Sequence, residues 1–313
     1  MATIRSRRLL IAGGFALFWP LLAAAPVAPV APNMLLLDGV AVGAEILAVG
    51  ERGTIIGSAD QGRTWEARPS PAKATLTGLS FAPDSRRGWA VGHDALILAT
   101  DDGGRSWRRQ WQGANLTDSF LDVLALDERH VIAVGAFGLC VETTDGGATW
   151  TTRRLLDDDY HLNRLTRGPT GTLYLAGEHG TLLRSRDRGA TWDGIHSPYD
   201  GSFYGILPLG ETRVLAYGLR GRLYLSEDDG DTWEPVENER RNLMLTAVAV
   251  APGRVIVAGQ ARAFVALDLA QRTLQSTHPA MQTAVAELLL LPDGALLCLG
   301  EAGVTLLPAA PQP

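Results

Sequence analysis

The sequence predicts a seven-bladed β-propeller, and three observations point to this all-β fold class. Similar phrases, such as AYGLRGRLYLSEDDGDTW at 216–233, recur at steps of 41 to 43 residues, a period typical of propeller blades. Most of these phrases end in the same turn motif. The apolar runs between them are short and alternate as strands do. The period is marked by seven glycines: Gly50, Gly92, Gly135, Gly177, Gly218, Gly259 and Gly300.

Each unit is expected to supply four short antiparallel strands. Segments such as GWAVG, TLLRS and RVLAYG are apolar and are bounded by glycine or aspartate, which is typical of strands. Helical solenoids can have similar periods, but no unit contains a convincing helical pattern of ten or more residues. The units are therefore expected to form the blades of one ring over residues 34–313.

The turn motif that ends the first five units is an Asp-box. Counted back from its tryptophan, Ser or Thr stands at −7, Asp at −5, Gly at −3 and Ser or Thr at −1. The aspartate can accept hydrogen bonds from turn N–H groups, and the glycine permits a positive φ. The tryptophan can bury its face between neighbouring blades. These structural residues are Asp60, Trp65, Asp102, Trp107, Asp145, Trp150, Asp187, Trp192, Asp228 and Trp233.

A catalytic or calcium-binding role for the box aspartates is disfavoured, because five equivalent residues spread around a ring cannot converge on one substrate. The last two units depart from the motif. Leu269 and Leu274 replace the aspartate and tryptophan of the sixth unit, and the seventh unit ends before a box begins. The packing between blades is expected to differ there.

The N-terminus is expected to be a signal peptide or an N-terminal anchor over residues 1–25. Three arginines (Arg5, Arg7, Arg8) precede an apolar run that ends in the small residues before Pro26, a pattern of export signals. Residues 26–33 are rich in proline and are expected to form a spacer. The predicted location is exported: periplasmic, or membrane-associated on the outer side.

Charge and cysteine content exclude several classes of function. Acidic residues outnumber basic ones by 34 to 28, which disfavours a nucleic-acid partner that is bound through overall charge. Cys140 and Cys298 are too few for a disulfide framework, and no Cys/His spacing suits zinc. Their predicted blades lie nearly across the ring, so both are expected to be free thiols. No cofactor or metal is predicted.

The wording of the repeats, VG…G.I..T.DGG.TW, resembles the photosystem II stability/assembly factor family of BNR-repeat propellers over about residues 38–307. The resemblance implies a non-catalytic assembly or interaction protein. It also implies a protein partner, which could be a membrane transporter or another envelope complex. The protein is expected to be a monomer.

Recognition is expected on the face opposite the Asp-boxes, where the repeats stop agreeing. That face would carry the second-to-third strand turns and the links between blades, including residues 111–120, 157–163 and 196–204. Rigid amphipathic aromatics dominate binding energetics. Alternatively, Phe120, Phe203 and Tyr204 begin inner strands and fill the channel of the propeller. The candidate contacts are Trp111, Tyr160, His161, His196, Tyr199, Phe203, Tyr204 and Arg220.

Asp-boxes also occur in sialidases, so an enzymatic function has to be considered. A sialidase needs an arginine cluster, a tyrosine nucleophile with a glutamate, and an aspartate, and its Phe/Tyr-Arg-Ile-Pro stretch is absent. No nucleophile elbow, P-loop or His-Glu-x-x-His motif is present either. A protein-binding scaffold is therefore favoured, with a glycan-binding module or a sialidase-like glycosidase as the alternative.

The last unit supplies only three predicted strands, near residues 286–291, 295–299 and 304–307. An unpaired sheet edge leaves open backbone donors and acceptors. The segment before the first unit, about residues 30 to 36, is the other stretch of chain that could fill this edge. We therefore expect it to pair with blade seven and close the ring.

Overall fold

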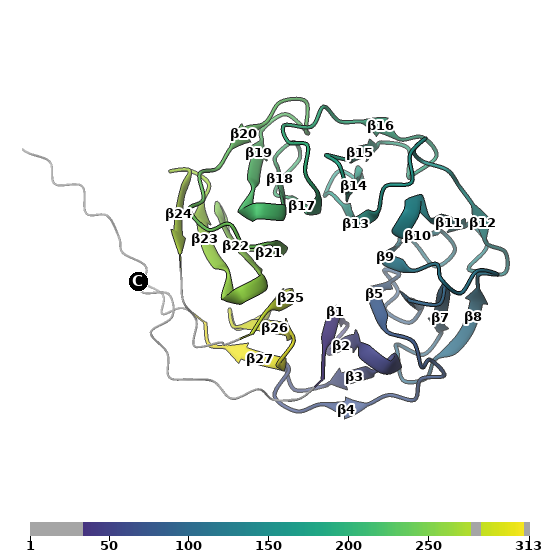
Figure 1. The fold of residues 1–313 in the computed structure, drawn as a ribbon. Coiled ribbons are helices and arrows are strands. Elements are labelled where there is room, and N and C mark those ends of the chain that lie inside the picture. Colours follow the sequence, from purple (N-terminus) through teal and green to yellow (C-terminus); the bar gives the residue numbers. More distant parts are fainter. Residues whose placement is uncertain (1–33, 277–282, 310–313) are drawn as a thin grey trace, which may run out of the picture.

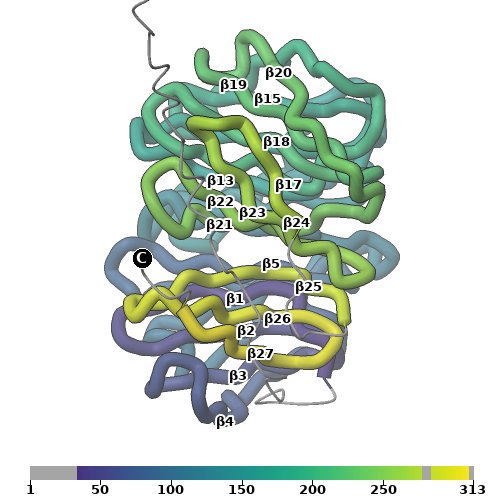
Figure 2. The backbone as a smooth tube through the Cα atoms, turned by 90° about the vertical axis from the view of Figure 1, so that its left-hand side faces the viewer, coloured from purple at the N-terminus to yellow at the C-terminus, as the bar shows by residue number. Residues whose placement is uncertain are grey.

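The computed structural model describes residues 34–276 and 283–309, which form a ring of seven antiparallel sheets around a common central axis (Figure 1). Its blades follow one another in chain order, and the yellow strands of blade seven lie beside the purple strands of blade one (Figure 2). The predicted seven-bladed propeller is confirmed. The expected signal or anchor and the spacer lie outside the described residues.

Each blade begins at the centre of the ring and runs outward, and its second strand is buried along most or all of its length, whereas its outermost strand is largely exposed. The innermost strands are β1 (Leu36–Val42), β5 (Leu76–Phe81), β9 (Phe120–Ala125), β13 (Leu162–Arg167), β17 (Phe203–Pro208), β21 (Met244–Ala251) and β25 (Val285–Leu290). The second strands are β2 (Glu45–Gly50), β6 (Gly88–Gly92), β10 (Val131–Gly135), β14 (Leu173–Gly177), β18 (Val214–Gly218), β22 (Arg254–Gly259) and β26 (Leu296–Gly300).

The outer half of each blade contains the remaining strands. The third strands are β3 (Ile55–Ser58), β7 (Leu96–Thr100), β11 (Cys140–Thr143), β15 (Leu182–Ser185), β19 (Leu223–Ser226), β23 (Phe264–Asp268) and β27 (Gly303–Leu307). The outermost strands are β4 (Glu66–Ala67), β8 (Arg108–Gln112), β12 (Thr151–Thr152), β16 (Asp193–Gly194), β20 (Glu234–Pro235) and β24 (Thr273–Ser276). Short 3-10 turns follow four second strands: η1 (Glu51–Gly53), η2 (Ala136–Gly138), η3 (Leu219–Gly221) and η4 (Gln260–Arg262).

The Asp-box loops join the third strands to the outermost strands. In the first box, Asp60 Oδ1 accepts the Thr64 N–H at 2.8 Å, and Asp60 Oδ2 accepts the Thr64 hydroxyl at 2.7 Å. The Gly62 N–H donates to the Ser58 hydroxyl at 2.8 Å. These bonds satisfy the polar groups of a tight turn inside the motif itself.

The glycine of each box lies against the preceding blade with a positive φ. A Cβ on Gly104 (φ 84°) would stand 2.2 Å from Leu47 of blade one. The five box tryptophans lie in the apolar clusters between a blade and its predecessor, where Trp107 is only 8% exposed. The box therefore fixes both the turn and the distance between blades.

Blade seven has three strands in the part of the chain that the structure describes. The expectation that residues 30–36 pair with blade seven is wrong for Leu36, because this residue pairs with Gly50 in blade one. Residues 30–33 lie outside the described residues. Cys140 and Cys298 are both buried and free, in blades three and seven, which confirms the prediction of two thiols.

Candidate functional site

One face of the ring, which we call the link face, is formed by the second-to-third strand turns and the links between blades. Backbone hydrogen bonds join these loops: the Gly138 N–H donates to the Tyr160 carbonyl and the Gly180 N–H to the Gly201 carbonyl, each at 2.9 Å. The opposite box face carries the Asp-box loops and the first-to-second strand hairpins. The two faces are thus built from different loops.

The turns of the link face hold their central residues in the left-handed region. This region is sparsely populated by non-glycine residues. In η2 it places Phe137, the central residue, at 66% exposure. The equivalent positions in the other 3-10 turns and in blade four are Arg52 (φ 56°), His179 (φ 51°), Arg220 (φ 57°) and Ala261 (φ 50°).

Four aromatic side chains of blades three and four pack in pairs on this face, and we call them the aromatic crown. The Tyr160 and His179 rings stack with centroids 4.5 Å apart, at an interplanar angle of 29°. The Phe137 ring meets the His161 ring edge-on, with centroids 4.8 Å apart. Tyr160 and His161 come from a link, whereas Phe137 and His179 come from turns. Turn and link thus hold each other's rings in place.

Glu178 supports the crown from below. Its Oε2 accepts the His161 N–H at 3.0 Å, and its Oε1 lies 3.2 Å from His161 Nδ1. Its charge also reaches Tyr204: burial, and then the nearby Glu178 carboxylate, raise the pKa of the Tyr204 phenol. One carboxylate therefore orients an imidazole and lies near a half-buried phenol.

Tyr199 extends the face toward blade five. Its ring lies 6.3 Å from the Tyr224 ring, and the Arg222 guanidinium carbon lies 5.9 Å from the Tyr199 centroid. A Cβ on Gly180 (φ 74°) would stand 2.5 Å from the Tyr199 carbonyl oxygen. Tyr199 is half-buried and packs on the core between blades four and five.

The other predicted contacts lie outside the aromatic crown. Trp111 belongs to strand β8 and not to a link, and its ring packs 5.8 Å from the Phe120 ring. Phe203 has 0% exposure at the start of β17, so it cannot offer a contact surface. His196 is exposed, and Arg220 is exposed at the centre of η3. Phe137 and His179 were not among the predicted contacts, although both stand where the repeats disagree.

A buried polar cluster inside the channel also escaped the sequence prediction. Its members are the third residues of four innermost strands, just after a register shift in each. Arg164 Nη2 contacts Glu287 Oε2 and lies 3.9 Å from Asp38 Oδ1, and Arg164 Nε lies 3.7 Å from Asp122 Oδ2. One guanidinium thus links blades one, three, four and seven across the ring.

The carboxylates of this cluster also accept hydrogen bonds from the next blade. Asp38 Oδ2 accepts the Leu79 N–H, and Asp122 Oδ2 accepts the Leu165 N–H, each at 2.7 Å. Burial raises the pKa of both carboxyls, and the Arg164 charge opposes that rise. We interpret the cluster as a structural tie between blades.

The residues that the structure describes contain no metal-binding cluster and no helix suited to crossing a membrane. Within residues 34–276 and 283–309, no three His, Cys, Asp or Glu side chains are placed to hold a metal ion. The same residues contain no helix that is long and apolar enough to cross a membrane. What the link face does present is two exposed rings, Phe137 and His179, packed on the half-buried rings of His161 and Tyr160.

Comparison with known proteins identifies the family. The sequence profile described as photosynthesis system II assembly factor YCF48 matches residues 41–116 and 108–303. The photosystem II assembly protein Ycf48 of Thermosynechococcus vestitus is 31% identical over 257 residues, which cover 77% of this chain and 74% of that protein. A photosystem II assembly lipoprotein Ycf48 of Synechococcus sp. strain CC9902 is 32% identical over 54% of this chain and 39% of its own length.

A solved structure, titled YCF48 bound to D1 peptide, superposes with a TM-score of 0.75. It is 22% identical and covers 96% of this chain and all of that one, so it supports the fold alone. The relatives reported above are named as assembly proteins, which agrees with the prediction of a non-catalytic propeller. The profile and the cyanobacterial relative together show that this chain belongs to the YCF48 family of photosystem II assembly factor-like propellers.

Proposed function

We propose that the protein is a non-catalytic scaffold that binds a protein partner through the aromatic crown of the link face. The observation that carries this proposal is the packing of two exposed rings, His179 and Phe137, on the half-buried rings of Tyr160 and His161. The relative titled as bound to D1 peptide supports a protein as the ligand.

The crown suits protein recognition for physical reasons. Its rings are held by turn–link hydrogen bonds and by Glu178, so little side-chain entropy remains to be lost on binding. Aromatic anchors surrounded by polar groups are the usual hot spots of protein interfaces. Tyr199 and the exposed Arg220 extend the proposed contact surface toward blade five.

We place this scaffold outside the cytoplasm, facing a membrane or envelope complex, as a monomer. The apolar N-terminal segment and a relative named as a lipoprotein support export. The partner complex could include a transporter. The glycan-binding alternative would use the same exposed rings, since aromatic faces also pack against sugars.

The test is site-specific photocrosslinking in the full chain, followed by identification of the captured protein. A photoreactive residue at position 137 should capture one protein from the envelope fraction, and Tyr160→Ala should abolish that capture. A photoreactive residue at Leu290, which is 38% exposed at the far end of an innermost strand, is the matched control and should capture nothing specific.

Equal capture at both positions would refute the crown as the binding site. Binding to a glycan array that is lost in Tyr160→Ala would instead establish the alternative. Circular dichroism of the variant should match that of the parent protein, because Tyr160 lies on the surface of a link and not in a core cluster.

A further inference from the structure

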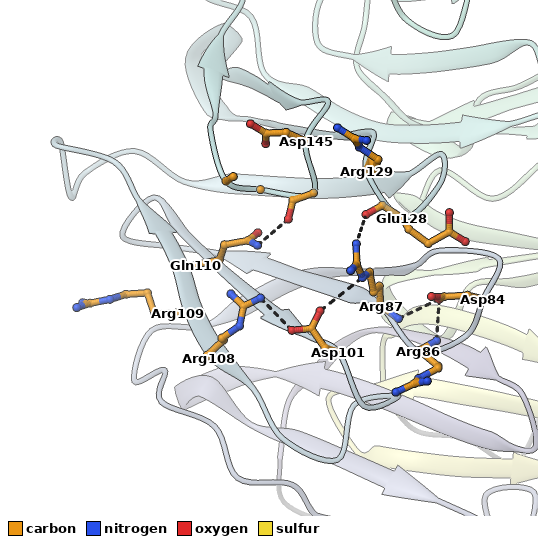
Figure 3. Close-up of a pocket in the computed structure, with 13 residues that line it drawn as sticks. Asp84, Arg86, Arg87, Asp101, Arg108, Arg109, Gln110, Glu128, Arg129 and Asp145 are labelled. Atoms are coloured by element: carbon orange, nitrogen blue, oxygen red, sulfur yellow. Dashed lines mark hydrogen bonds and ion pairs between the residues drawn. The ribbon is translucent and has the colours of Figure 1, made fainter.

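A cleft on the box face lies between blades two and three, far from the link-face loops. Its volume is about 1000 Å³, which is at the upper end of the range for ligand sites. Figure 3 shows its walls, which come from strand β8, two first-to-second strand hairpins, and the second and third Asp-box loops. They carry five arginines, among them Arg87, Arg108 and Arg129, and four acidic residues.

Two guanidiniums in this cleft share one carboxylate. Arg108 Nη2 lies 3.0 Å from Asp101 Oδ2, and Arg87 Nε lies 3.7 Å from Asp101 Oδ1. Arg87 also donates to the Glu128 backbone carbonyl at 3.2 Å. Since a single negative charge faces both arginines, their joint charge remains positive.

The three other carboxylates of the cleft, Asp84, Glu128 and Asp145, make no ion pair with Arg87, Arg108 or Arg129. Asp84 Oδ1 accepts the backbone N–H groups of Arg86 and Arg87 at 2.8 and 3.0 Å. The Glu128 side chain points away from Arg87 and Arg108 in Figure 3. Asp145 uses both oxygens inside its own loop, where they accept the Thr143 and Thr149 hydroxyls at 2.8 and 2.6 Å. The Arg129 guanidinium makes no ion pair with any residue that the structure describes. Five arginines and four carboxylates therefore line the cleft, and Arg87 and Arg108 share one carboxylate as their ion-pair partner while Arg129 has none among the described residues.

The charge is specific to blade two. The residue after the box tryptophan is Arg108 there, whereas the equivalent residues in the other boxed blades are Glu66, Thr151, Asp193 and Glu234. If this position served only the packing of blades, Arg108 would not need to be basic where the other blades have an acidic residue or a threonine. The chain as a whole carries a formal net charge of −6, so a local excess of arginine needs a local reason.

We infer that this cleft binds an acidic peptide segment of a protein partner, with carboxylates placed between Arg87, Arg108 and Arg129. Guanidinium groups match carboxylates through paired, charge-assisted hydrogen bonds. The cleft is long and open, and its arginines lie on three separate elements. That spacing suits several carboxylates along a chain. It gives the propeller a second binding site, independent of the aromatic crown.

The test is fluorescence anisotropy with a labelled hexapeptide of alternating glutamate and serine. The wild-type chain should bind it, and the same peptide with glutamine for glutamate should not bind. The double variant Arg108→Gln, Arg129→Gln should lose about tenfold in affinity, as expected for two exposed charge pairs. Binding should also weaken with added salt, because the charges are exposed to solvent.

A matched control changes two arginines on the same face outside the cleft. Arg63 and Arg105 have side chains that are 59% and 71% exposed, and Arg63→Gln with Arg105→Gln alters the net charge equally. This control should keep wild-type affinity. Equal losses in both double variants, or no binding by the wild type at low salt, would overturn the site. Stronger competition by pyrophosphate or a short oligonucleotide than by unlabelled peptide would also overturn it, by showing a phosphate site.

Discussion

At the scale of single residues, identical motif positions have different surroundings. Trp107 is 8% exposed, and its Nε1–H donates to the Gly104 carbonyl at 3.1 Å. Trp150 is only partly buried, and its Nε1 is shielded from solvent without an acceptor. The two tryptophans occupy the same position in the repeat, yet only the indole N–H of Trp107 has a hydrogen-bond acceptor. Identical residues at equivalent positions therefore do not contribute equally to stability.

We predict that Trp107→Ala lowers the free energy of unfolding by about 3–5 kcal/mol, the usual cost of removing a buried large aromatic. Trp150→Ala should cost less, because that ring buries less surface and loses no hydrogen bond. Urea unfolding followed by circular dichroism measures both changes. Equal losses in the two variants would contradict this ranking.

At the scale of the element, the Asp-box loop is held by its own aspartate. Hydrogen bonds from the loop's own hydroxyls and N–H groups hold the pKa of Asp60, Asp145, Asp187 and Asp228 at about 2. The ionised carboxylate therefore stabilises the loop more than the protonated carboxyl does. The sixth blade has Leu269 and a strand β24 of four residues in place of this device.

The box predicts an acid-sensitive fold with a defined sign. A carboxyl whose pKa is lower in the folded chain adds stability above its unfolded pKa near 4, and that stability is lost as the pH falls toward 2. The melting temperature should therefore drop between pH 4 and pH 2. Asp145→Asn should show a shallower drop than the parent protein, starting from a lower value at pH 7. Parallel pH profiles for both proteins would argue against this linkage.

At the scale of the whole molecule, the channel cluster opposes the opening of the ring. Arg164 reaches acidic groups from blades one, three and seven, and its partner Glu287 is 123 residues away in the chain. A seven-bladed ring has no other connection through its centre than such side chains. The Thr246 hydroxyl, on blade six, donates to Glu287 Oε1 at 2.8 Å and extends the same tie.

We predict that Arg164→Met destabilises the ring by about 3–5 kcal/mol at neutral pH, the cost of leaving the buried Glu287 carboxylate without its ion partner. Burial raises the pKa of Asp38 to about 8. Its contribution to stability is therefore complete below pH 4 and is lost as the pH rises toward 8. Arg164 lowers this pKa, so without Arg164 the loss should continue to higher pH. Chemical denaturation at pH 5, 7 and 9 measures it, and a loss that ends at the same pH in both proteins would refute the role of Arg164.

Much of the architecture was predictable because each blade repeats its own local chemistry. Seven glycines at steps of 41 to 43 residues defined the blades, and the predicted four antiparallel strands are present in six of the seven sheets that the structure describes. The expected contacts were less accurate. Trp111 was assigned to a link although it continues strand β8, because no sequence signal marks where an outermost strand ends.

By itself, the sequence determined the fold class, the number of blades and the hydrogen bonding of the Asp-boxes, since all three depend on residues close together in the chain. The tertiary structure alone decided which groups meet between blades: Phe137 with His161, Arg164 with Glu287, and the Arg87 guanidinium with the Glu128 carbonyl. These encounters depend on how the ring closes and how each link crosses to the next blade. Neither the closure of the ring nor the path of the links can be predicted from a local sequence pattern.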